Sequence, residues 1–150
     1  GTVLRTAAHQ LHPSVVEKAG LPRALGALAD EFGRTAGLDV RVAVPPADLA
    51  LPPTTGVAIY RIAQEALRNV VKHAGVKQAD LMLDAAGGTL ILRVSDAGKG
   101  CDTTGIETNG GLGVIAMRQR AEAVGGRLTL AARPGGGTTV TAVFPPPRTR

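Results

Sequence analysis

At 150 residues, 44% of them hydrophobic, the chain is long enough to bury the core of one ordinary domain, and no apolar run approaches the ~20 residues of a membrane-spanning helix. The net charge is +5, but Arg and Lys are scattered and aromatic side chains for base stacking are nearly missing, so we expect a basic surface for polyphosphate or an acidic protein rather than nucleic acid. No charged-then-apolar leader opens the sequence, and the single cysteine, Cys101, excludes an internal disulfide, which fits a cytoplasmic location.

The first predicted elements are a terminal fragment and an amphipathic helix. Residues 1–15 resemble the end of a helix that Pro13 stops, and we expect this segment to be the remnant of an element from a longer protein. Between Gly20 and Gly37, apolar residues recur at spacings of three and four, and the closing glycine is typical of a helix end. The apolar stripe of this predicted helix consists of Leu21, Leu25, Leu28 and Phe32.

A strand and a long helix are predicted next. Residues 39–44 alternate between polar and apolar side chains, as a strand does, and residues 45–56 form a Pro-rich connection. The long helix is predicted from about Thr55 to Ala74. Its apolar stripe consists of Ile59, Ile62, Ala63, Ala66, Val70 and Ala74.

Two hairpins and a further helix complete the predicted elements. The paired glycines Gly87 and Gly88 predict a hairpin turn, and a second turn is predicted around "RPGGG". The order is strand 78–85, strand 89–96, loop 97–111, helix 112–126, strand 127–132 and strand 138–144. Hairpins mixed with helices favour the α+β class: a two-layer sandwich with a mixed, mostly antiparallel sheet and helices on one face, not a doubly wound dinucleotide fold.

The long helix carries an unusual polar stripe. Arg61, Glu65, Arg68, Asn69 and Lys72 lie three, four and seven residues apart, so they fall within one sector of the helix. A solvated face with ordinary i,i+4 neighbours would explain the charged members. Asn is the exception, because it is a poor residue in a helix interior, and its carbonyl oxygen is a suitable ligand for Mg²⁺.

A second polar cluster follows the strand at 89–96. Asp96 ends this apolar strand, and Gly98 and Gly100 follow it. A carboxylate there can accept a hydrogen bond from an exocyclic amine, and the glycines let the backbone pass close to a flat ring. A simple turn at a strand end is the alternative, because the pattern matches neither a P-loop nor a dinucleotide fingerprint.

A third cluster leads into the helix at 112–126. Gly110, Gly111 and Gly113 precede and begin this helix. The first turn of a helix presents free N–H groups and the positive end of the helix dipole to an anion. Alone this is only suggestive, but the three clusters in this order predict a nucleotide site.

Taken together, these residues resemble the GHKL superfamily, whose Bergerat-fold ATPase domain occurs in sensor histidine kinases, the DNA gyrase B subunit, Hsp90 and MutL. "EALRNVVKHA" resembles the N box, "DAGKG" the first glycine box, "GGLGVIAMRQR" the second, and "GGGTTVTAVFP" the strand pair that follows. The "QEALRNVVKHA" form, the short loop before "GLG" and "LHPSVVEKAGLPRAL" resemble the histidine kinases that partner NarL-type response regulators.

The resemblance implies a role for each member of the polar stripe. Asn69 would be the Mg²⁺ ligand, and Glu65 would orient or deprotonate a water molecule or acceptor. Lys72 and His73 would approach the phosphates of ATP.

The resemblance also implies where the nucleotide binds. Asp96 would hold the adenine amino group, with Thr138 supporting it through water, and Cys101–Gly110 would form a lid. Gly98 and Gly100 would shape the adenine pocket, and the phosphates would meet Gly111, Leu112 and Gly113.

One departure concerns the phosphoacceptor histidine, which an acidic residue normally follows. His9 precedes Gln10 and His12 precedes Pro13, so neither fits. We therefore expect residues 1–18 to be a remnant of the dimerisation and phosphotransfer helix, residues 19–147 the catalytic ATP-binding domain, and 148–150 a tail. The acceptor helices of a homodimeric parent kinase and a response regulator would be its partners, with no nucleic-acid or membrane contact by this domain.

Two other functions stay open at this stage. An anti-sigma-factor-type serine kinase resembles the same boxes but should lack the dimerisation remnant at Leu11–Leu25. A degenerate module that binds nucleotide without transfer is the other, although intact Glu65, Asn69 and Asp96 argue against it.

Overall fold

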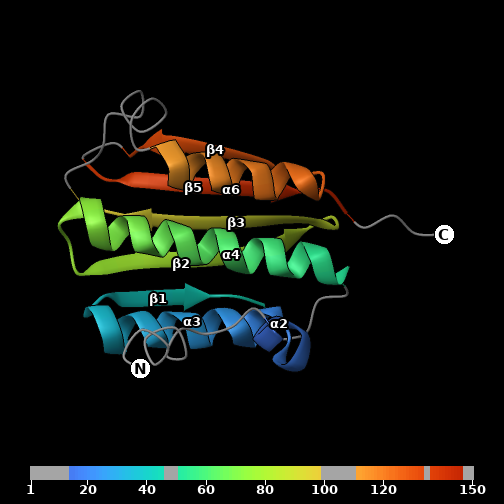
Figure 1. Ribbon diagram of the computed structural model, residues 1–150, viewed down its shortest axis with the longest axis horizontal. Coiled ribbons are helices and arrows are strands. Elements are labelled where there is room, and N and C mark those ends of the chain that lie inside the picture. The colour runs from blue at the N-terminus through green and yellow to red at the C-terminus, as the bar shows by residue number, and fades with distance from the viewer. Residues whose placement is uncertain (1–13, 46–50, 99–110, 134–135, 147–150) are drawn as a thin grey trace.

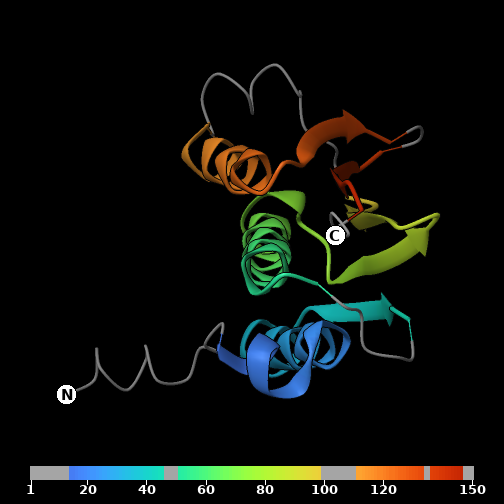
Figure 2. The ribbon, with the colours of Figure 1, turned by 90° about the vertical axis from the view of Figure 1, so that its right-hand side faces the viewer.

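The computed structural model describes residues 14–45, 51–98, 111–133 and 136–146, which form two layers. One layer is a five-stranded sheet, and the other consists of helices that cover a single face of that sheet (Figures 1 and 2). The helices are α2 (Ser14–Ala19), α3 (Leu21–Ala36), α4 (Pro53–Asn69), its π-helical continuation η1 (Val70–Ala74) and α6 (Gly111–Ala123). The strands are β1 (Asp39–Ala43), β2 (Gln78–Ala86), β3 (Thr89–Asp96), β4 (Arg127–Ala132) and β5 (Thr138–Phe144).

The sheet has the strand order β1-β2-β3-β5-β4. Strand β1 pairs with β2 in parallel, whereas the other three pairs are antiparallel. The α+β class and the mixed, mostly antiparallel sheet predicted from the sequence are therefore confirmed. Strand β5 lies between β3 and β4, and its register places Thr138 opposite Asp96.

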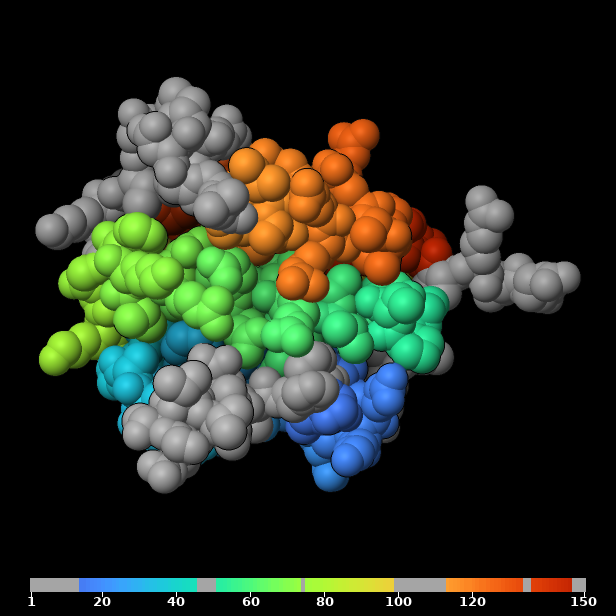
Figure 3. Space-filling view, in the orientation of Figure 1, coloured from blue at the N-terminus to red at the C-terminus, as the bar shows by residue number. Residues whose placement is uncertain are grey.

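The core lies between the two layers, and α4 is the middle helix over it. In Figure 3, α4 separates α3 from α6 on the helical face. The predicted apolar stripe of α4 is buried at every position whose side chain the structure describes. Large side chains with less than 2% of their surface exposed fill this core: Leu25, Leu28, Leu38, Ile59, Tyr60, Ile62, Leu67, Leu81, Leu92, Val94, Met117 and Phe144.

Helix α3 ends as the sequence predicts. Gly37 adopts a left-handed conformation, with φ of 67°, and its N–H donates to the carbonyl of Phe32. A left-handed residue at this position is strained for any side chain with a Cβ, so glycine stops the helix at little cost. The β2–β3 hairpin turns in the same way through Gly87 and Gly88, whose φ values are 60° and 84°.

Three local features differ from the expected elements. Helix α4 begins at Pro53, before the expected Thr55, because proline at the first helical position has no N–H to leave unpaired. Its last turn, η1, is a π-helix, which apolar spacing does not predict. Short helix α2 was not predicted, and the helix expected to end at Pro13 lies outside the described residues.

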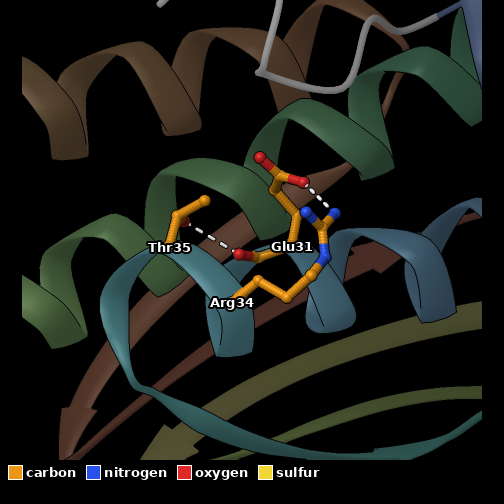
Figure 4. A network of polar contacts seen from close by, with 3 residues as sticks. All are labelled: Glu31, Arg34 and Thr35. Carbon is orange, nitrogen blue, oxygen red and sulfur yellow. Dashed lines mark hydrogen bonds and ion pairs between the residues drawn. The ribbon is translucent and has the colours of Figure 1, made fainter.

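The contact between α3 and α4 contains buried polar groups. Glu31 of α3 is 8% exposed; its carboxylate pairs with Arg34, and its carbonyl accepts a hydrogen bond of 2.8 Å from Thr35 Oγ1 (Figure 4). Tyr60 of α4 is fully buried, and its hydroxyl has no hydrogen-bond partner among the described residues. Burial raises the pKa of Tyr60; the Arg61 guanidinium opposes this shift and the Glu31 carboxylate adds to it.

We expect Tyr60→Phe to raise the free energy of unfolding by about 1 kcal/mol at neutral pH. The substitution keeps the ring that packs in the core and removes a hydroxyl whose desolvation no described hydrogen bond offsets. Urea denaturation of the two proteins measures the difference. A destabilised variant would mean that the hydroxyl has a partner in solution.

The same pair of proteins should differ at alkaline pH. Because the folded-state pKa of Tyr60 is raised above the ordinary 10.0, folding holds the phenol proton more tightly than the unfolded chain does. This contribution to stability is complete below that ordinary value and is lost as the pH rises through the folded-state pKa. The parent should therefore lose more stability than Tyr60→Phe over this range, and equal slopes would contradict the assignment.

Candidate functional site

The predicted site residues gather at one end of the molecule. Figure 1 shows that the C-terminal end of α4 with η1, the N-terminal end of α6 and the end of β3 lie at the same side of the fold. The start of β5 joins them, because its first residue pairs with the last residue of β3. The topology therefore brings the three predicted clusters to the same end of the fold.

Asp96 is the most deeply buried acidic residue of this end. Its side chain is 6% exposed, and Oδ1 accepts a hydrogen bond of 2.8 Å from the backbone N–H of Gly98. Thr138, its cross-strand partner, is 9% exposed. A carboxylate can accept several hydrogen bonds, so Asp96 keeps capacity for a donor beyond the Gly98 N–H. The structure brings Asp96, Gly98 and Thr138, three of the predicted site residues, together at the end of β3.

The turn between β4 and β5 lies directly against Asp96. Gly137 has a φ of 102°, and a Cβ at this position would overlap the Asp96 carbonyl oxygen and lie 2.9 Å from the Cα of Ala97. A Cβ on Gly136 would lie 3.0 Å from the Gly98 carbonyl oxygen. Only backbone without side chains fits here, which explains why glycines occupy the turn.

Arg133 makes a second contact to Asp96 that the sequence analysis missed. Its Nη1 donates a hydrogen bond of 3.0 Å to the Asp96 carbonyl. The two residues are 37 positions apart in the sequence, and they meet only because β5 pairs with both β3 and β4. The run of glycines after Arg133 was the one sequence signal that a close backbone approach occurs there.

The polar stripe of α4 is partly engaged in local pairs. Arg68 Nη1 lies 2.9 Å from Glu65 Oε1, and Arg61 Nη1 donates to Gln64 Oε1 at 3.2 Å. Such i,i+3 pairs at a half-exposed surface contribute little to stability. A solvated helix face would show the same pairs. They therefore do not distinguish a solvated stripe from a nucleotide-binding stripe.

Glu65 also contacts the first turn of α6. Gly113, at the start of α6, packs against Glu65 so closely that a Cβ there would lie 2.5 Å from Glu65 Oε2. The carboxylate therefore lies against the second glycine box and does not face bulk water alone. Glycine at this position gives the carboxylate room beside the first turn of the helix.

Asn69 is the last residue of α4, where the π-helical turn η1 begins. Its side chain is half-buried, while Lys72 and His73 in η1 are exposed. A π-helical turn changes the direction of the side chains that follow, and such turns occur frequently at functional sites. A half-buried amide oxygen suits Mg²⁺, which binds hard oxygen ligands and takes most of its shell from phosphate and water.

Part of the predicted site is not described. Gly100 and the expected lid, Cys101–Gly110, lie outside the described residues. Gly111 and Leu112 lie in the first turn of α6, where only the backbone is described.

The described surface also has a hollow of about 680 Å³ at the opposite end of the fold. It lies between α2 and the first turns of α3 and α4, and Val16, Leu21, Pro53 and Gly56 are among its lining residues. None of the predicted site residues lines it, so it is separate from the site.

A buried acid at a strand end, a glycine-led helix and an acidic–amide stripe on the central helix thus lie at one end of an α+β sandwich. Residues 54–148, more than half of the chain, match the family described as "Histidine kinase-, DNA gyrase B-, and HSP90-like ATPase". The chain therefore belongs to this family, as an ATP-binding catalytic domain of the histidine kinase type.

Several proteins to which the chain is similar are histidine kinases. The sensor histidine kinase MctS of Rhizobium johnstonii is 33% identical over 144 residues, which are 95% of this chain and 31% of MctS. The histidine kinase domain of the blue-light activated histidine kinase of Erythrobacter litoralis EL346 is 26% identical with a TM-score of 0.70, covering 83% of this chain and 64% of that one. The histidine kinase AdeS of Acinetobacter baumannii shares the fold, with a TM-score of 0.65 at 16% identity over 89% of this chain and 73% of that one. The chain thus spans less than a third of the length of MctS.

We expect Gly137→Ala to destabilise the fold by about 2 kcal/mol or more, since its Cβ would overlap backbone and the left-handed φ strains any side chain. Gly26→Ala is the matched control. Gly26 lies inside α3 with nothing within 4 Å of an added Cβ, so this change should stabilise the fold by about 0.5–1 kcal/mol. Thermal unfolding of both variants compares them, and a Gly137→Ala protein as stable as the parent would show that the turn can move away from Asp96.

Proposed function

We propose that this domain binds Mg·ATP at the Asp96 end of the sheet and donates the γ-phosphoryl group to a histidine on a dimerisation helix. A response regulator of the NarL type would then receive the phosphoryl group. The observation that carries this proposal is the burial of Asp96, which lies opposite Thr138 in the β3–β5 register and whose carboxylate accepts a hydrogen bond from the Gly98 N–H.

The adenine base is the ligand that this corner fits. The carboxylate can accept a hydrogen bond from the exocyclic amine of adenine, and Thr138 can support the base through water. Gly98 carries no side chain, so a flat ring can approach the backbone there. Guanine presents a carbonyl oxygen at the corresponding position, which a carboxylate repels, so the site should prefer ATP to GTP.

The phosphates would extend from this corner toward α4 and α6. Backbone N–H groups in the first turn of α6, at Gly111, Leu112 and Gly113, would meet them at the positive end of the helix dipole. Lys72 and His73 in η1 would approach the phosphates, and the Lys72 ammonium group would add positive charge. Gly100 and the lid at Cys101–Gly110 would close over the nucleotide.

Asn69 would hold Mg²⁺ through its amide oxygen. When bound, the ion neutralises phosphate charge and aligns the γ-phosphoryl group, which is the main requirement of phosphoryl transfer. Glu65 would orient or deprotonate the acceptor, and its ion pair with Arg68 at 2.9 Å would hold the carboxylate in place.

The proposed roles of these residues imply how the chain divides into segments. We propose that residues 19–147 are the catalytic domain of a cytoplasmic kinase segment, and that residues 1–18 belong to the dimerisation and phosphotransfer helix of a homodimeric parent. Transfer would therefore need acceptor helices in addition to this domain.

Asp96→Asn is the first test of the nucleotide site. The variant keeps an oxygen that can accept the Gly98 N–H, but its amide would present a donor where adenine also donates. We expect ATP binding to weaken by about 10- to 100-fold and the preference over GTP to disappear, because hydrogen bonds to charged groups contribute about 1.5–3 kcal/mol. Calorimetric titration of ATP and GTP measures both quantities.

Asp84→Asn controls for the loss of one negative charge, since Asp84 is an exposed residue of β2. It should bind ATP as the parent does. If Asp96→Asn also keeps the parental preference for ATP, adenine is read elsewhere and the proposal is wrong.

Asn69→Ala tests the metal ligand. We expect it to weaken ATP binding in the presence of Mg²⁺ and to leave binding in EDTA unchanged. The fold should be as stable as the parent or slightly more stable, because Ala has the better helix propensity. Gln119→Ala, which removes an exposed amide from α6, is the control. Unchanged Mg²⁺-dependent affinity in Asn69→Ala would remove Asn69 from the metal site.

A further inference from the structure

Arg133 joins two parts of the sheet that are not neighbours. Its backbone N–H donates to the Gly137 carbonyl at 2.9 Å, and its own carbonyl accepts from the Gly136 N–H at 3.1 Å, so its backbone is fixed in the β4–β5 turn. Its side chain reaches Asp96 at the end of β3, although β5 lies between β4 and β3 in the sheet. The Arg133 side chain therefore extends across β5 to reach the end of β3.

The acceptor of the Arg133 hydrogen bond is a main-chain atom, so the contact acts on the backbone of Asp96. Arg133 binds the main-chain carbonyl of Asp96, and the carboxylate of the same residue accepts from the Gly98 N–H. Both bonds restrain the short segment from Asp96 to Gly98, one from each side. The Gly137 backbone packs on the same carbonyl, which leaves the peptide plane after Asp96 little freedom to rotate.

We propose that Arg133 is a positioning residue for the nucleotide base: it fixes the backbone of Asp96 and thereby the direction of the Asp96 carboxylate. This inference rests on the proposed function, in which Asp96 binds adenine. The role differs from a phosphate contact, because the guanidinium is directed at a main-chain oxygen on the base side of the site.

Arg133→Gln tests the role in the whole chain, with Arg127→Gln as a matched control that removes the same charge from an exposed position on β4. We expect Arg133→Gln to bind ATP about tenfold more weakly, the effect of losing one charge-assisted hydrogen bond. The affinity for adenosine, measured by competition with ATP, should fall by the same factor, because the substitution affects binding of the base. Arg133→Lys should recover part of the affinity, and Arg127→Gln should bind both ligands as the parent does.

Two further measurements separate positioning from a general loss of structure. The Gly98 amide should exchange its hydrogen faster in Arg133→Gln without nucleotide, because the carboxylate that it bonds is less restrained. The preference for ATP over GTP should also fall, which a uniform loss of stability would not produce. Arg133→Lys serves for the same comparisons if Arg133→Gln does not fold.

The possible results distinguish the two proposals. A loss that is large for ATP and absent for adenosine would show that Arg133 contacts phosphate and would overturn the positioning role. Parental binding by Arg133→Gln beside weakened binding by Asp96→Asn would overturn this inference and leave the nucleotide site standing. Parental binding by Asp96→Asn would overturn the proposed function itself.

Discussion

The packing of α4 is the constraint on which the rest of the structure depends. This helix lies between α3 and α6 and covers the middle of the sheet, so its apolar stripe must fill the core while its remaining surface serves three other purposes. One side contacts α3 around Tyr60 and Glu31, another contacts α6 through Glu65 and Gly113, and its end carries Asn69. The polar stripe is therefore held in place by hydrophobic burial, which stabilises the whole helix and not any one polar side chain.

The corner at Asp96 is built by a different kind of interaction. Here few side chains pack, and two segments of backbone, 96–98 and 136–137, approach one another with glycines at 98, 136 and 137. Close approach needs residues without Cβ atoms, and it leaves the buried carboxylate and the Arg133 guanidinium as the main polar side chains of the corner. The two halves of the proposed site thus have separate physical origins: backbone packs on backbone at the proposed base side, and helix packs on helix at the proposed phosphate side.

The sequence predicts those features that depend on local patterns. Helix α3 is visible in the spacing of Leu21, Leu25 and Leu28 and in Gly37, and the β2–β3 hairpin is visible in its paired glycines. Features that depend on contacts between distant residues are not visible: the pairing of β5 with β3, the approach of Gly113 to Glu65, and the bond from Arg133 to Asp96. The π-helical turn after Asn69 is not predicted because it covers only five residues, too few for apolar spacing to reveal a change of helix type.

The candidate site residues can be recognised from the sequence because they too belong to local patterns. Asp96, Asn69 and the glycines belong to short motifs, so their types and order can be recognised without knowing the fold. Arg133 stands outside these motifs, and its contact depends on sheet order. Residues proposed to touch a ligand are thus easier to recognise in this sequence than the residue proposed to hold them in place.

The position of Tyr60 has a consequence for spectroscopy. It is the only tyrosine, the chain has no tryptophan, and Tyr60 is a fully buried residue of α4. Intrinsic fluorescence from this protein therefore comes from one phenol in the core, not from the Asp96 corner. An optical signal that follows this phenol reports the packing of the helical layer, and nucleotide binding has to be followed by heat, by NMR or by a label placed at the other end of the molecule.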